Sequence, residues 1–244
     1  HGLCDVRYAY ENIHFPADDA ALAAARRRLA FEELYFLTLG LRLLRARRTT
    51  VKGKTCAAVD MTPFFGALPF SLTGAQARAV DDILRDMTAE RPMNRLVQGD
   101  VGSGKTMVAA AGIYFAAKNG LQAALMAPTE ILAEQHYHTL APLLEKLGVR
   151  CALLTASTKA KTRRSILEQL AAGGIDLAIG THALLSPDIS YQNLGLVVTD
   201  EQHRFGVNQR AALGAKGENP HLLVMSATPI PRTLALMIYG DLDV

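Results

Sequence analysis

A glycine-rich segment at residues 99–106 has the residue types and spacing that hold a chain of phosphates. It contains, in order, Gly99, Asp100, Val101, Gly102, Ser103, Gly104, Lys105 and Thr106. The glycines let consecutive backbone N–H groups turn toward one anion, and the helical segment that follows adds the positive end of its dipole. We therefore expect nucleotide binding in which Lys105 reaches the β- and γ-phosphates and the Thr106 hydroxyl binds Mg²⁺. The alternative is an ordinary glycine turn before a helix.

Two adjacent carboxylates, Asp200 and Glu201, follow an apolar run that ends at Thr199. A phosphate loop needs a carboxylate at the end of a neighbouring strand to hold magnesium, so we assign Asp200 to the metal. Glu201 is placed to polarise the water that attacks the γ-phosphate, which predicts hydrolysis and not binding alone. The alternative is a surface turn with two acids. His203 either couples hydrolysis to movement or caps the end of the strand.

Alternating strands and helices must position these residues. Short apolar runs predict strands at residues 95–98, 123–127, 150–154, 177–180, 194–199 and 222–226. The segments between them predict helices at residues 106–119, 130–147, 159–172 and 208–215. This alternation implies an α/β fold with a parallel sheet and helices on both faces. Ligands of such sheets bind at the carboxyl ends of the strands, and each motif above directly follows a strand.

The first quarter of the chain has a different composition. Residues 18–48 are rich in Ala, Leu, Arg and Glu and contain no Pro, which predicts one long helix with a broad apolar face. Residues 42–54 hold six basic residues and no acidic one. They form either a solvated helix end or a stretch that contacts phosphates. Proline and glycine at residues 63–69 predict a boundary before a helix that begins near Thr73.

Composition excludes several classes of protein. Of the 244 residues 50% are hydrophobic and 20% charged, which predicts a folded domain of the α/β kind with one extra element. The three cysteines are far apart, which excludes a disulfide framework and a structural zinc site and suits a reducing cytoplasm. Since no apolar run approaches about 20 residues, we expect a soluble protein. With neither Met nor a signal peptide at its start, the chain is expected to be a piece of a longer protein.

The acidic segment at residues 200–203, Asp-Glu-Gln-His, resembles the acidic motif of superfamily 2 helicases and translocases when it accompanies a phosphate loop. The resemblance implies that the phosphate loop and the acidic motif belong to the first, RecA-like motor lobe of such a protein. A segment with Phe70 and Gln76 is similar to that family's adenine-reading Q motif, and the Gln76 amide can both donate to and accept from a base edge.

Three further segments are similar to motifs of the same family. One contains Pro128 and Thr129 and another contains Thr181 and His182; in the family both lie along the nucleic acid. Hydroxyls and helix N-termini at these places can bind phosphates without reading sequence, although a strand-to-helix cap is the alternative for both threonines. The third is similar to the motif that couples hydrolysis to movement, or else is a local cap; it consists of Ser226, Ala227 and Thr228.

Longer stretches narrow the resemblance to the RecG family of bacterial branched-DNA translocases. They are residues 13–16, 25–34, 200–207 and 225–236. The Mfd family of transcription-repair coupling factors shares much of this lobe, but Gln202 favours RecG. A non-catalytic, nucleotide-dependent binding module that docks a partner through residues 42–54 is a further alternative, although a pure switch would not need Glu201.

The RecG resemblance implies an ATP-driven motor that moves on double-stranded DNA and remodels stalled forks and Holliday junctions in recombination and repair. It implies a bacterial cytoplasmic, nucleoid-associated protein whose partners are double-stranded and branched DNA and no membrane. Residues 1–60 would be the end of a wedge domain and a linker helix, and residues 61–244 the first lobe. The second lobe, which carries the arginine finger, would be absent, so we expect this chain alone to hydrolyse ATP barely.

Overall fold

The computed structural model describes residues 2–48, 52–200 and 217–227. Glu201, His203, Thr228 and the helix expected at residues 208–215 lie outside this part of the chain. The described residues divide into two compact units, one ending at residue 48 and the other beginning at residue 52.

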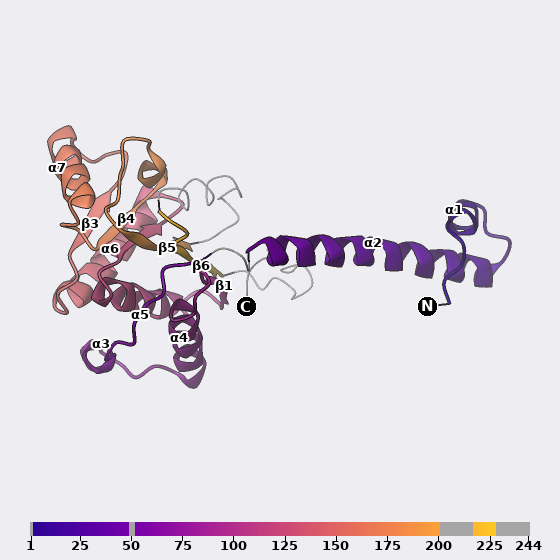
Figure 1. The fold of residues 1–244 in the computed structure, drawn as a ribbon, viewed down its shortest axis with the longest axis horizontal. Coiled ribbons are helices and arrows are strands. Elements are labelled where there is room, and N and C mark those ends of the chain that lie inside the picture. Colours follow the sequence, from indigo (N-terminus) through magenta and orange to yellow (C-terminus); the bar gives the residue numbers. More distant parts are fainter. Residues whose placement is uncertain (1, 49–51, 201–216, 228–244) are drawn as a thin grey trace. The chain divides into compact units, whose positions relative to one another are not determined.

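The first unit consists of two helices, α1 (Val6–His14) and α2 (Asp19–Arg48) (Figure 1). The long helix expected over residues 18–48 is therefore confirmed, whereas α1 was not predicted. Its start was signalled by Asp5, whose carboxylate accepts a hydrogen bond from Arg7 N at 2.8 Å and caps the helix.

The apolar face of α2 is largely exposed between residues 31 and 43. The large side chains exposed there are Phe31, Leu34, Tyr35, Phe36, Leu39 and Leu43.

The second unit is built on a parallel sheet of six strands in the order β1-β6-β5-β2-β4-β3. The strands are β1 (Asn94–Gln98), β2 (Gln122–Met126), β3 (Cys151–Leu154), β4 (Leu177–Gly180), β5 (Leu194–Asp200) and β6 (His221–Ser226). Each strand starts and ends within one residue of its predicted position, because a strand buried on both faces is a continuous apolar run in the sequence.

Helices cover both faces of the sheet, as predicted (Figure 1). They are α3 (Thr62–Ala67), α4 (Gly74–Met87), α5 (Lys105–Lys118), α6 (Glu130–Glu145), α7 (Ala160–Ala171) and the 3₁₀ helix η1 (His182–Leu185). Alternate residues of β2 enter two separate apolar cores, Leu125 in one and Met126 in the other. Residues from α3, α4, α5 and α6 fill the first core, and residues from α7 and η1 fill the second.

Two stretches near the expected boundaries pack into the α/β unit. The prolines at residues 63–69 were interpreted as a break, but Pro63 stands in the first turn of α3, where a helix tolerates proline. Residues 52–60 pack within the α/β unit: Gly53 N donates to the Glu90 carbonyl at 2.8 Å and Cys56 N to the Met87 carbonyl at 2.9 Å. The two compact units of the chain meet in sequence near residue 50.

None of the helices in the described ranges is both long enough and apolar enough to cross a membrane.

Candidate nucleotide-binding site

The predicted motifs follow strand ends that meet at one edge of the sheet. At the carboxyl end of each pair, Gln98 of β1 lies beside Ser226 of β6, and Asp200 of β5 lies beside Met225 of β6. On the other side of β5, Thr199 lies beside Met126, after which residues 127–129 leave β2. The prediction that the phosphate loop, Asp200 and Ser226 share one edge is confirmed.

The phosphate loop joins β1 to α5, which begins at Lys105, one residue before its predicted start. Gly102 and Gly104 adopt φ values of 79° and 80°, a left-handed conformation that favours glycine. A side chain at Gly99 would place its Cβ 2.6 Å from Ser103 Oγ, and one at Gly104 would collide with Gln76. At Gly99 and Gly104 the loop therefore forms a narrow cradle in which a Cβ would displace the Ser103 or Gln76 side chain, which fits the binding of a phosphate by backbone N–H groups.

Lys105 lies across the mouth of this loop. Its Nζ donates to the carbonyl of Gly99 at 2.6 Å and to that of Asp100 at 2.7 Å. An ammonium group has three donors, so among the described contacts one N–H remains for a phosphate oxygen. Thr106 is half-buried in the first turn of α5, and the loop residues from Asp100 to Ser103 are exposed.

Gln76 connects the Q-motif segment directly to the phosphate loop. Its Oε1 accepts from Thr73 N at 2.8 Å, and Thr73 Oγ1 accepts from Gln76 N at 3.3 Å, so the two residues form a capping box at the start of α4. Gln76 Nε2 donates to the Ser103 carbonyl at 2.8 Å. The sequence did not predict this last contact. Adenine recognition by Gln76 and by Phe70, whose ring is 48% exposed, stays a prediction.

Asp200 ends β5 with its carboxylate 14% exposed. Its Oδ2 lies 2.6 Å from Nε2 of His136, a largely buried side chain on α6. Sequence reasoning missed His136. A usable signal was its spacing from Thr129, since a residue roughly two turns along a helix lies on the same face as the helix start.

The donors at this edge fit a magnesium ion bound together with a nucleotide. The described residues contain no cluster of three or more His, Cys, Asp or Glu side chains that could hold a metal alone. Magnesium does not need one, because it takes one or two protein ligands and completes its octahedron with phosphates and water. Thr106 and Asp200 are the residues that would hold it.

The segments expected to contact nucleic acid follow β2 and β4. The hydroxyl of Thr129 accepts from Leu132 N at 3.3 Å, so the cap that was its alternative role is confirmed, and Pro128 beside it is half-buried. Thr181 is buried, whereas His182 is exposed. Both line an open hollow of about 640 Å³ that also includes Arg163. Contact with nucleic acid stays a prediction for all four motif residues.

The coupling motif begins at the carboxyl end of β6. Ser226 is fully buried, and its carbonyl accepts from Gly99 N at 3.2 Å, so this motif contacts the phosphate loop through its backbone. Ala227 and Asp100 both line a second hollow, of about 470 Å³. The coupling role stays a prediction.

Comparison with known proteins confirms the resemblance inferred from the sequence. The family described as DEAD/DEAH box helicase matches residues 73–237. The chain is 52% identical to the ATP-dependent DNA helicase RecG of Synechocystis sp., over 99% of this chain and 30% of that protein, and 49% identical to RecG of Bacillus subtilis, over 99% and 36%. A solved structure of RecG bound to a three-way DNA junction matches with a TM-score of 0.89 and 46% identity over 100% of this chain and 33% of that one. The chain thus spans about a third of these relatives' length.

Proposed function

The chain belongs to the DEAD/DEAH box helicase family, and from that premise we propose that it is the ATP-binding lobe of a DNA helicase or translocase that remodels branched DNA. The observation that carries this proposal is the placement of Lys105 and Asp200 at one edge of a parallel sheet. Lys105 follows β1, Asp200 ends β5, and β6, which bears Ser226, lies between these two strands. The similarity to RecG over nearly the whole chain supports branched DNA, at stalled forks and Holliday junctions, as the substrate in recombination and repair.

In this proposal the chain's residues bind and orient ATP. The N–H groups of the glycine loop and the Lys105 ammonium hold the β- and γ-phosphates, Thr106 and Asp200 hold the metal, and Gln76 and Phe70 contact adenine. A bound magnesium ion supplies positive charge that offsets the charge developing on the phosphates. Glu201 accepts a proton from the attacking water. The residues that couple ATP hydrolysis to movement of the motor are His203, Ser226, Ala227 and Thr228.

The remaining parts of the motor belong to the same proposal. Residues 1–60 serve as the end of a wedge domain and a linker helix, and a second lobe of the full-length protein supplies the arginine finger. Without that lobe, we propose, the 244-residue chain hydrolyses ATP barely. Pro128, Thr129, Thr181 and His182 contact the DNA backbone, and the protein works in the bacterial cytoplasm at the nucleoid. An Mfd-like role is not favoured, since the relatives described above are RecG helicases.

Glu201→Gln in the full-length protein tests the hydrolytic part of this proposal. The amide keeps the size of the side chain but cannot take the proton of the attacking water, so DNA-stimulated turnover should fall by about 10²-fold or more. The affinity for a non-hydrolysable ATP analogue should stay within about threefold of the wild-type value, because the N–H groups of the phosphate loop bind the phosphates. Phosphate release and fluorescence titration measure the two quantities. Normal turnover in Glu201→Gln would show that another group activates the water.

A further inference from the structure

Among the described residues, the His136 side chain contacts the Asp200 carboxylate. Its Nε2 lies 2.6 Å from Asp200 Oδ2, and the exposed fractions of the two side chains are 9% and 14%. An ionised carboxylate only accepts hydrogen bonds, so the imidazole donates through Nε2–H. The contact therefore fixes which way the carboxylate faces.

Packing alone does not explain a histidine at this position. The buried face of α6 already presents Ala133, Leu140, Ala141 and Leu144 to the sheet, each no more than 4% exposed. An imidazole among them leaves two ring nitrogens that need hydrogen-bond partners. An apolar residue of similar size would pack on this face without that requirement.

We infer that His136 is a positioning residue that holds the Asp200 carboxylate in the orientation that the nucleotide-bound magnesium requires. With Oδ2 engaged by the imidazole, Oδ1 would remain for the metal and its water shell. Groups behind a metal ligand commonly orient it in this way. The inference rests on the proposed function, because it assigns His136 to the metal site of that ATPase.

Helix α6 connects His136 to the segment that is expected to contact DNA. The same helix begins at Glu130 and is capped by Thr129, which lies in the segment expected to contact DNA, and Glu130 Oε1 accepts from Ala156 N at 3.0 Å. His136 follows roughly two turns later. The carboxylate of the metal site is thus held from a helix whose first turn lies in the DNA-contacting segment.

The test measures how much Mg²⁺ the full-length protein needs to bind a fluorescent, non-hydrolysable ATP analogue. His136→Leu should raise the half-saturating Mg²⁺ concentration by about 10-fold or more. His136→Gln, whose amide nitrogen reaches the place of Nε2, should restore it to within about threefold, whereas the shorter His136→Asn should behave like His136→Leu. The matched control is His138→Leu, since His138 lies exposed on the same helix and should leave the requirement unchanged.

A purely structural role would give a different pattern. It would lower the melting temperature and weaken nucleotide binding equally with Mg²⁺ and with EDTA. The inference predicts unchanged affinity in EDTA, and if His136→Leu does not fold, the comparison of the Gln and Asn variants decides. Equal Mg²⁺ requirements for His136→Asn, His136→Gln and the wild type would overturn the inference while leaving the proposed function intact. If wild-type binding itself does not respond to Mg²⁺, the proposed function fails and the inference fails with it.

Discussion

Gly104 shows how closely single residues are fixed at the nucleotide-binding edge. Its φ of 80° is left-handed, and any Cβ would collide with the Gln76 amide. A left-handed conformation costs a residue with a Cβ about 1–2 kcal/mol, and the collision would also break the Gln76 contact to the Ser103 carbonyl. The loop thus has little freedom to accept another residue here.

Gly104→Ala should therefore weaken binding of an ATP analogue by about 10-fold or more. Fluorescence titration measures the affinity. Gly66→Ala is the control, because Gly66 has no atom within 4 Å of its would-be Cβ and no left-handed φ, and this change should leave affinity unaltered. Wild-type affinity in Gly104→Ala would contradict the cradle described for the loop.

The residues of the candidate nucleotide-binding site could be predicted in part from the sequence. The phosphate loop and Asp200 were identified because their spacing is local and each follows an apolar run. The contacts of Gln76 to Ser103 and of His136 to Asp200 were not, because they join residues 27 and 64 positions apart. Such pairs depend on the order of strands in the sheet, and a single sequence does not contain that order.

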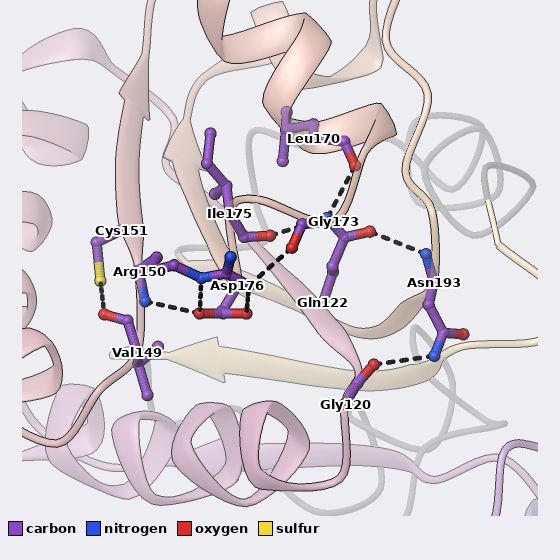
Figure 2. Close-up of polar contacts among 10 residues, drawn as sticks. All are labelled: Gly120, Gln122, Val149, Arg150, Cys151, Leu170, Gly173, Ile175, Asp176 and Asn193. Atoms are coloured by element: carbon purple, nitrogen blue, oxygen red, sulfur yellow. Dashed lines mark hydrogen bonds and ion pairs between the residues drawn. The ribbon is translucent and has the colours of Figure 1, made fainter.

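At the scale of elements, a buried glutamine joins three segments at the start of β2 (Figure 2). Gln122 Nε2 donates to the carbonyls of Leu170 and Ile175 at 2.9 and 2.8 Å, and its Oε1 accepts from Asn193 N at 2.9 Å. Beside it in Figure 2, Arg150 pairs with Asp176 at 2.7 Å. The end of α7 and the residues preceding β4 and β5 are thereby held together, at the edge opposite the phosphate loop.

Gln122→Leu should lower the free energy of unfolding by about 2 kcal/mol or more, because it removes the hydrogen bonds that Gln122 donates to the Ile175 carbonyl and accepts from Asn193 N. Urea denaturation measures the change. The matched control is Gln135→Leu, at an exposed position on α6, where little change is expected. Equal free energies of unfolding for the two variants would mean that the Gln122 hydrogen bonds do not stabilise the fold.

A second buried side chain makes the stability of the α/β unit depend on pH. His221 is fully buried; its Nδ1 accepts from Met93 N at 2.9 Å and its Nε2 donates to the Lys54 carbonyl at 2.7 Å. Burial lowers the pKa of His221 below 6.5, against smaller opposing effects of the Lys54 carbonyl and Asp86. The folded protein therefore takes up this proton less readily than the unfolded chain.

The stability due to His221 should be fully present above pH 6.5 and decrease as the pH falls from 6.5 toward the lower folded pKa. The slope from one group is at most about 1.4 kcal/mol per pH unit. Urea denaturation between pH 7.5 and 5.5 should show a shallower slope for His221→Gln than for the wild type. A His138→Gln control, at an exposed site, should keep the wild-type slope. Identical slopes for His221→Gln and the wild type would refute the assignment.

The strands were predictable because each is a continuous apolar run, but two short α-helices were not. In α1 the sequence offers only an Asp5 cap and nine residues, too few for a clear periodic pattern. In α3 the proline that suggested a break stands at the helix start, where no hydrogen bond is lost. Helices this short depend on tertiary packing, as Phe64 of α3 does by being fully buried in the core against Tyr114.

At the scale of the whole molecule, the chain spans about a third of its curated relatives and divides into two units. The α/β unit holds the residues that would bind ATP. The helical unit presents a row of exposed aromatic and leucine side chains on α2. The proposed assignment of the chain to a linker and a first motor lobe predicts that fast ATP turnover needs the rest of the full-length protein.

ATP turnover by the full-length protein, measured with and without three-way-junction DNA, tests the central claim that Lys105 binds the triphosphate in an ATP-driven DNA motor. The account predicts that the junction stimulates the wild type and that Lys105→Ala stays near background in both conditions, having lost the ammonium group that Gly99 and Asp100 hold over the phosphate loop. Turnover by Lys105→Ala at the wild-type rate, with the same stimulation, would contradict it.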